Sequence, residues 1–153
     1  MNRCLDFLRL IFVSPELLFA LVPFAIFAYE PAWADVLLKP MSEGVAWGLS
    51  AAGLSLGTLA FSYKEGFDLL SLSGGRKVLL EWPEYPMIKV RILVAFGWCL
   101  VGVVACLISV WMVAKNLHPL LGITFLISGL VAAATASATI ALARFRLREL
   151  LGE

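Results

Sequence analysis

Ionisable side chains are scarce in this sequence of 153 residues: charged residues make up 15% of it, and there is one histidine. An average soluble domain is about 25% charged and about 45–50% apolar, whereas 61% of this chain is hydrophobic. The composition therefore excludes an ordinary soluble domain. Twelve Lys and Arg nearly balance eleven Asp and Glu, so no basic excess indicates nucleic-acid binding and no acidic excess indicates disorder.

Few side chains in the sequence could bind a metal ion or take part in redox chemistry. The single histidine, His118, precedes a proline and has no Cys, Asp or Glu at ligand spacing, so neither a metal site nor a histidine-assisted nucleophile is predicted. The three cysteines include no Cys-x-x-Cys pair. Cys99 and Cys106 would lie about 10 Å apart along one helix, which is too far for a disulfide. We expect them to be small packing residues, and we predict no cofactor and no enzymatic activity.

The apolar residues gather in four runs without Asp, Glu, Lys or Arg. These runs cover residues 17–29, 44–63, 92–114 and 116–143. A bilayer core about 30 Å thick needs about 20 apolar helical residues, so the last three runs are long enough and the first must recruit its flanks or thin the membrane. The sequence predicts an all-α polytopic membrane protein that forms one domain over residues 1–153. Its four transmembrane helices are expected at about residues 15–30, 44–63, 90–114 and 119–143.

The first predicted span has a marked beginning. Residues 14–16 read Ser-Pro-Glu, which offers an N-cap hydroxyl, a proline at the first helical position and an acid near the positive helix end. We expect Glu16 to cap this helix, and a coupling site within the span is the alternative. Residues 1–13 are expected to form an interfacial helix. A secretory signal with a small-x-small cleavage site at residues 32–34 is the alternative interpretation of this region.

The basic residues predict the orientation of the spans, because Lys and Arg near span ends are retained on the cytoplasmic side. In a four-span arrangement one side collects ten of them, namely Arg3, Arg9, Lys64, Arg76, Lys77, Lys89, Arg91, Arg144, Arg146 and Arg148. The other side has Lys39 and Lys115. Both termini, the loop of residues 64–89 and the basic tail of residues 144–153 are therefore predicted to be cytoplasmic. This N-in, C-in protein is expected in a bacterial inner membrane.

The loop of residues 64–89 is the longest polar feature. In the simpler interpretation the second helix continues through Leu70 and stops at Gly74 and Gly75. The alternative is a small hairpin across these glycines, with strands at residues 69–73 and 76–81. The sequence Ser-Gly-Gly-Arg-Lys at residues 73–77 offers backbone N–H groups and two cations to a phosphate. A lipid headgroup is favoured over a nucleotide as the source of that phosphate.

The second half of the loop is rich in rings and prolines, with Trp-Pro-Glu-Tyr-Pro at residues 82–86. Such a segment is expected to anchor at the headgroup level, and docking of a cytosolic protein is the alternative. The residues predicted to contact lipid or a partner are Arg76, Lys77, Leu79, Leu80, Trp82 and Tyr85.

Small residues follow the faces of several predicted helices. The second span has Gly, Ala and Ser at alternating steps of three and four, and residues 132–141 are almost all Ala, Ser or Thr. Small surfaces permit close helix contact, so we expect a homo-oligomer. The expected packing residues are Gly53, Gly57, Gly102, Gly129 and Ala136. Hydroxyls at depth are expected to bond backbone carbonyls, and lining a narrow pore is the alternative.

Two functions remain after these exclusions. The first is a non-enzymatic, oligomeric membrane scaffold or sensor that docks or regulates a cytosolic partner through residues 64–89 and 144–153, of a kind found in bacterial defence or stress systems. The alternative is a pore-forming or membrane-depolarising effector of the holin or toxin kind. The expected partners are membrane lipids, anionic ones included, further copies of the chain and a cytosolic protein. No direct nucleic-acid binding is expected.

Overall fold

A computed structural model of the chain describes residues 14–30, 45–71 and 85–151, together with residues 32, 33, 36, 37 and 39. Over this part of the chain the fold is all-α, as predicted. Its four helices are α2 (Pro15–Tyr29), α4 (Val45–Ser71), α6 (Tyr85–Ala114) and α7 (Pro119–Leu151). The predicted interfacial helix at residues 1–13 and the loop residues 72–84 lie outside the described residues.

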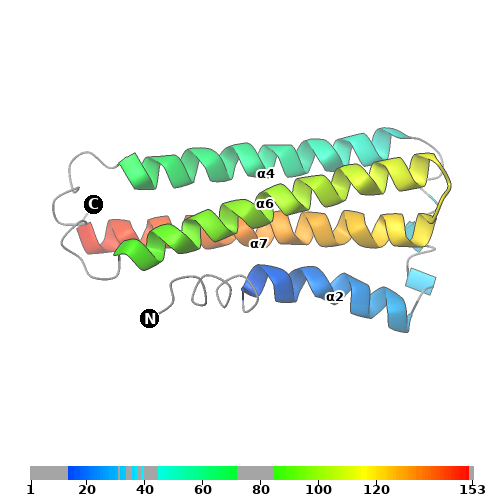
Figure 1. The fold of residues 1–153 in the computed structure, drawn as a ribbon, viewed down its shortest axis with the longest axis horizontal. Coiled ribbons are helices and arrows are strands. Elements are labelled where there is room, and N and C mark those ends of the chain that lie inside the picture. The colour runs from blue at the N-terminus through cyan, green and yellow to red at the C-terminus, as the bar shows by residue number, and fades with distance from the viewer. Residues whose placement is uncertain are drawn as a thin grey trace.

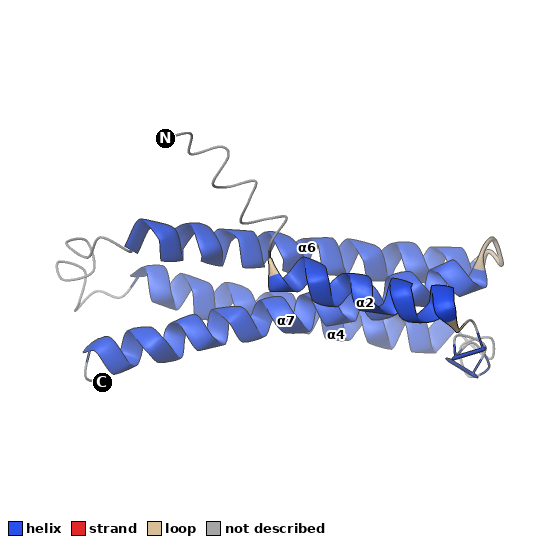
Figure 2. Cartoon of the chain, turned by 90° about the horizontal axis from the view of Figure 1, so that it is seen from below, coloured by secondary structure: helices blue, strands red, loops and turns tan. Residues whose placement is uncertain are grey.

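The four helices lie side by side in one bundle and alternate in direction (Figure 1). The start of α6 and the ends of α4 and α7 lie at one end of the bundle, and the α6–α7 turn and the end of α2 lie at the other. The short helix α2 begins near the middle of the bundle's length and covers one half of it (Figure 2). The first turn of α2 therefore lies deep along the bundle rather than at its end.

Helix α2 begins where the sequence predicts. Ser14 is the N-cap, its hydroxyl accepts a hydrogen bond from the Leu17 backbone N–H at 3.2 Å, and Pro15 occupies the first turn. The second proline, Pro23, is buried inside the helix and has no N–H to donate to the carbonyl of Phe19. The helix thus keeps one weakened turn between its two ends.

The remaining helices extend beyond their apolar runs. Helix α4 continues through Leu70 to Ser71, as the simpler interpretation of the loop expects, and this excludes a hairpin strand that begins at residue 69. Helix α6 already starts at Tyr85, and α7 runs through the basic tail to Leu151. Polar residues prolong these helices because their side chains can remain exposed while the backbone hydrogen bonds continue.

The turn between α6 and α7 is short. Asn116 has a positive φ of 50°, a left-handed conformation that asparagine tolerates better than most residues. The Leu117 N–H donates to the carbonyl of Met112 at 3.2 Å, which satisfies an acceptor at the end of α6. The turn therefore holds α6 and α7 as an antiparallel hairpin.

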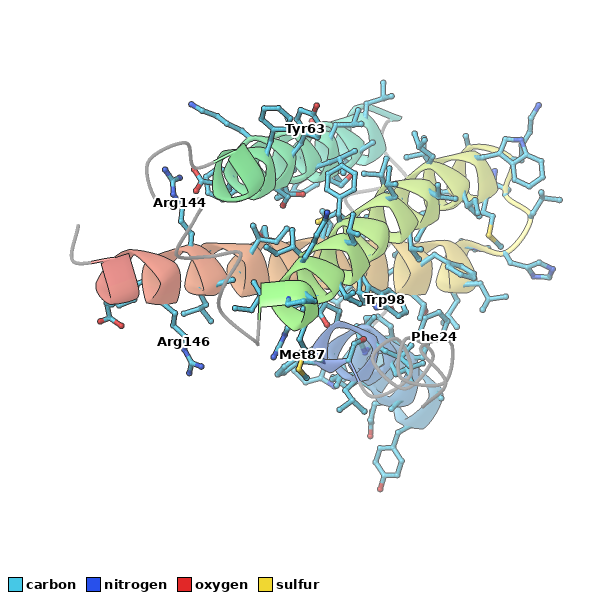
Figure 3. The ribbon with its side chains drawn as sticks, turned by 60° about the vertical axis from the view of Figure 1, so that its left-hand side comes forward. Phe24, Tyr63, Met87, Trp98, Arg144 and Arg146 are labelled. Carbon is cyan, nitrogen blue, oxygen red and sulfur yellow. The ribbon has the colours of Figure 1, made fainter. Side chains whose placement is uncertain are left out.

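Two clusters of buried residues fill the interior. One consists of Ile92, Ala95, Cys99, Ala136 and Ile140. The other consists of Phe27, Cys106, Ile123 and Leu126. Helix α2 packs on α7 through an edge-to-face contact between Phe24 and Phe125, whose ring centroids are 5.5 Å apart. Figure 3 shows Phe24 on α2 and Trp98 on α6 on the same side of the bundle.

Large apolar side chains also cover the outside of the bundle. Exposed examples from all four helices are Leu18, Phe19, Leu54, Phe61, Leu100, Val104, Leu121 and Leu142. Two helical segments, Pro86–Ala114 and Pro119–Arg146, are long and apolar enough to cross a membrane, and Pro15–Tyr29 is apolar but shorter. The structure thus shows a helical protein with two possible membrane-spanning helices.

Candidate functional site: a buried acid and its hydroxyl neighbours

The site is built around one carboxyl group, that of Glu16. Although Glu16 lies in the first turn of α2, only 3% of its surface is exposed. Its Oε1 atom accepts a hydrogen bond from the Thr139 hydroxyl of α7 at 2.7 Å. The sequence suggested a helix-capping role, but the hydroxyl of Ser14 caps α2. The side chain of Glu16 instead reaches across to the neighbouring helix.

Thr139 lies between two oxygen atoms. Its Oγ1 atom is 2.7 Å from Glu16 Oε1 and 3.0 Å from the backbone carbonyl oxygen of Thr135. The carbonyl contact is the ordinary bond of a threonine to the preceding turn of its own helix. The carboxyl contact joins α2 to α7 over 123 residues of sequence.

Thiols and hydroxyls bridge the other three helices. The Cys99 thiol of α6 donates to the Ser62 hydroxyl of α4 at 3.5 Å and also lies 3.7 Å from the carbonyl oxygen of Ala133 on α7. The Cys106 thiol lies 3.7 Å from the carbonyl oxygen of Leu126. Both cysteines are fully buried.

Most other hydroxyls are satisfied within their own helix. Donors to carbonyls three or four residues earlier are Ser55, Thr58, Thr124, Thr135 and Ser137. This is the carbonyl bonding expected of hydroxyls in apolar helices. Ser109 and Ser128 differ, because each is buried and has no hydrogen-bond partner within the described ranges.

Basic side chains collect at the end of the bundle where α4 and α7 finish and α6 begins. Arg144 of α7 forms a salt bridge with Glu65 of α4, and these side chains are 26% and 13% exposed. Arg144 and Arg146 point to opposite sides of α7 (Figure 3). We call this region the basic end and define it by Lys64, Lys89, Arg91, Arg144 and Arg146.

The structure does not describe most of the predicted contact residues of the loop. Arg76, Lys77, Leu79, Leu80 and Trp82 lie outside the described residues. Tyr85 is the first residue of α6, and the placement of its side chain is also outside the description. These six residues therefore remain sequence predictions.

The predicted packing residues divide into two groups. Gly102, Gly129 and Ala136 lie in the α6–α7 contact, where Gly102 faces the Gly129 carbonyl and Ala136 is fully buried. Gly53 and Gly57 of α4 are exposed, and a Cβ atom at either would meet no other atom within 4 Å. The bundle itself thus leaves this face of α4 open.

Sequence reasoning missed the pairing of Glu16 with Thr139. The proline-acid start of α2 indicates a cap, and the tract around Thr139 indicates packing. Only the depth at which α2 begins along the bundle brings the two together. In the described part of the chain no group of three or more His, Cys, Asp or Glu residues is arranged to hold a metal ion.

Comparisons with protein-family models, with curated proteins and with solved structures found no match. Over its described residues the chain is thus an all-α bundle with two possible membrane-spanning helices and with the acid Glu16 buried between α2 and α7.

Proposed function

We propose that this chain is a four-span integral membrane protein with both termini in the cytoplasm, and that it serves as a non-enzymatic scaffold or sensor for a cytosolic protein. Helices α2, α4, α6 and α7 are the proposed spans, and residues 1–13 lie along the inner surface. The setting we propose is a bacterial inner membrane.

The outside of the bundle supports the membrane placement. Exposed large apolar side chains occur on every helix, for example Leu18 on α2, Leu54 on α4, Val104 on α6 and Leu142 on α7. Soluble monomers rarely expose contiguous apolar patches beyond a few hundred Å². In a bilayer the lipid acyl chains would surround these side chains, so their apolar surface would not be exposed to water.

The observation that carries the scaffold proposal is the basic end. There the exposed cations of Lys64, Lys89, Arg91 and Arg146 lie around the ends of α4 and α7 and the start of α6. Residues 72–84, which include most of the predicted contact residues, follow α4 and precede α6 in the sequence. A cationic surface at the cytoplasmic side of a membrane attracts both anionic lipids and acidic protein surfaces.

The open face of α4 supports assembly into a homo-oligomer. Gly53 and Gly57 lie four residues apart on it and have free space where a side chain would be. In a membrane, such small residues let two helices approach closely. A second copy of the chain is the occupant we propose for this face.

A pore remains the second candidate function. The observation that supports a pore is the exposure of Ala134 and Ala138 on α7, within the tract of residues 132–141. Several copies that met along this surface would place small residues around an axis. This candidate predicts loss of membrane potential on expression, whereas the scaffold does not.

The orientation is tested first with single cysteines introduced by Lys64→Cys and Lys115→Cys in a variant whose Cys4 is replaced by serine. A thiol reagent that cannot cross membranes should label position 115 in intact cells and position 64 only after the membrane is opened. Labelling of both positions in intact cells would overturn the four-span arrangement.

The scaffold role is tested by purification from the native membrane in mild detergent, with the neighbouring genes co-expressed. We expect a soluble protein in fixed ratio, and loss of that protein from the Trp82→Ala, Tyr85→Ala double variant. The matched control is Trp111→Ala, which changes an exposed ring on α6 near the opposite end. Retention of the partner by the double variant would contradict the proposed docking site.

A further inference from the structure

Three aromatic rings meet on the outside of the bundle near the basic end. The Tyr63 and Phe67 rings of α4 are stacked, with centroids 6.0 Å apart and an angle of 19° between their planes. The Tyr63 ring also contacts Phe96 of α6, at a centroid distance of 6.0 Å. Tyr63 and Phe67 are 59% and 58% exposed, and Tyr63 lies on the side of the bundle opposite Phe24 of α2 (Figure 3). The three rings thus form one surface that bridges α4 and α6.

Helix α6 continues this surface as a stripe with a charge at one end. The members of the stripe follow one another at steps of four, three and four residues, and they are Lys89, Leu93, Phe96 and Leu100. Such steps place side chains on one face of a helix. Leu93 and Leu100 are 54% and 46% exposed. Lys89 and Leu100 are about 16 Å apart along the axis at 1.5 Å per residue, which is close to the thickness of one leaflet of a bilayer core of about 30 Å.

Two lysines flank the rings, and neither forms a salt bridge with another described residue. Lys64 is exposed and lies three residues before Phe67, so these two side chains share a face of α4. Lys89 is exposed at the end of the stripe on α6. The salt bridge in the described part of the chain joins Arg144 to Glu65. The charges of both lysines are therefore available to an anion outside the bundle.

In the proposed placement these side chains lie at the inner boundary of the membrane. Tyr63 is the last residue of the uncharged run 44–63, and Lys89 lies three residues before the run 92–114. Lysines and amphipathic rings are favoured at this level, where the lipid headgroups are. Phe96 and Leu100 lie deeper, beside the acyl chains. From the cytoplasm inward the surface thus offers cations, a hydroxyl, rings and then aliphatic side chains, which is the order of groups that complements a phospholipid.

We propose that this surface binds one anionic phospholipid of the inner leaflet. Lys64 and Lys89 bind the phosphate and the rest of the anionic headgroup, since hydrogen bonds from a lysine to a phosphate are strengthened by charge. The Tyr63 hydroxyl donates to a phosphate or ester oxygen, and the acyl chains lie along Phe96 and Leu100. A zwitterionic lipid carries its own cation beside the phosphate, so it gains less from the two lysines.

The bound lipid would leave the arginines of α7 free for other contacts. Arg144 is engaged with Glu65, and Arg146 lies on the side of the bundle opposite Tyr63 (Figure 3). One side of the basic end therefore binds lipid while the other remains open to a cytosolic protein. This inference rests on the proposed membrane placement and does not depend on the docking of a partner.

The test measures lipid binding to the full chain in mixed micelles by native mass spectrometry. Dioleoyl phosphatidylglycerol and dioleoyl phosphatidylcholine share their acyl chains, so a difference between them reports the headgroup. We expect the wild type to prefer phosphatidylglycerol and the double variant Lys64→Gln, Lys89→Gln to lose this preference, at about fivefold in affinity for each lysine. The matched control is Lys115→Gln, which removes an exposed lysine in the α6–α7 turn at the opposite end (Figure 1), and it should keep the preference.

A second pair of variants tests the rings. Tyr63→Ala with Phe67→Ala should weaken the binding of both lipids without loss of helix content, because the rings contact lipid of either charge and are exposed. Trp111→Ala, which removes an exposed ring near the opposite end, is the matched control and should change neither. Excess glycerol 3-phosphate, which offers a phosphate without acyl chains, should not displace the bound phosphatidylglycerol.

Three results would overturn the inference. They are equal binding of the two lipids by the wild type, an unchanged preference in the double lysine variant, and displacement of the lipid by glycerol 3-phosphate, which would show a site for the phosphate alone. The failure of the proposed function is distinguishable. Labelling of position 64 or 115 from the wrong side would contradict the four-span placement itself. If the topology holds and a partner is captured but the two lipids bind equally, the scaffold stands and the lipid site does not.

Discussion

Gly102 of α6 and Gly129 of α7 face each other backbone to backbone. A Cβ atom at Gly102 would lie 2.5 Å from the carbonyl oxygen of Gly129, and a Cβ atom at Gly129 would lie 2.6 Å from the carbonyl oxygen of Gly102. Real Cβ atoms essentially never come so close to another atom, and a backbone oxygen cannot rotate away. The two glycines therefore set how closely α6 and α7 approach.

We predict that Gly102→Ala destabilises the bundle by about 1–3 kcal/mol, the usual effect of forcing extra atoms into a packed contact. The measurement is thermal or denaturant unfolding in detergent. The matched control is Gly97→Ala on the same helix, where a Cβ atom meets nothing within 4 Å. That variant should be neutral or gain about 0.5–1 kcal/mol from helix propensity. Equal effects of the two changes would contradict the close contact.

The salt bridge between Arg144 and Glu65 should couple α7 to α4. Because both side chains are largely shielded from water, we expect Arg144→Gln to lower the unfolding free energy by about 1.5–3 kcal/mol, as for hydrogen bonds to charged groups. A double-mutant cycle with Glu65→Gln measures the coupling directly. Arg146→Gln, at an exposed position, serves as the control and should change stability by less than either. A coupling energy near zero would show that the pair is not formed.

The buried hydroxyl of Ser109 should be dispensable for stability. It is fully buried without a hydrogen-bond partner within the described ranges, and an unsatisfied buried polar group costs about 1–3 kcal/mol. Ser109→Ala is therefore expected to leave the unfolding temperature unchanged or to raise it. Ser55→Ala, which removes a bond of 2.8 Å to the Ala52 carbonyl, should lower it. A marked loss of stability in Ser109→Ala would reveal a partner for this hydroxyl.

A substitution on the open face of α4 should change the oligomeric state without changing the fold. A Cβ atom at position 57 meets nothing within 4 Å in the single chain, so we expect the larger side chain of Gly57→Leu to keep a second helix at a distance without disturbing the fold. We expect a smaller mass in detergent by light scattering, with the helix content and the unfolding temperature retained. Leu56→Ala, at the preceding residue of the same helix, is the control for a general effect of substitution. An unchanged mass for Gly57→Leu would place the self-association surface elsewhere.

Much of the helical architecture follows from local sequence features. Ser14 and Pro15 define the start of α2 through capping and backbone restriction. The uncharged runs predict where apolar helices lie, and Asn116 followed closely by Pro119 ends one helix and starts the next. These signals act within a few residues of the chain, so they can be interpreted without a fold.

The candidate site depends on information of another kind. Glu16 and Thr139 are 123 residues apart, and nothing local indicates that α2 begins beside the second half of α7. The helix ends at Ser71 and Leu151 likewise lie beyond the apolar runs, because exposed polar side chains do not stop a helix. Gly53 and Gly102 look alike in sequence, and only the packing distinguishes an open face from a close contact.

Helix α7 is longer than a bilayer core is thick. Its 33 residues span about 50 Å at 1.5 Å per residue, whereas a bilayer core is about 30 Å thick. In the proposed placement roughly 20 Å of unbroken helix therefore extends past the hydrocarbon, with Arg144 and Arg146 on it. In that placement a rotation of α7 about its own axis would turn Arg144 and Arg146 at the cytoplasmic end, and it would move Arg144 away from Glu65 of α4.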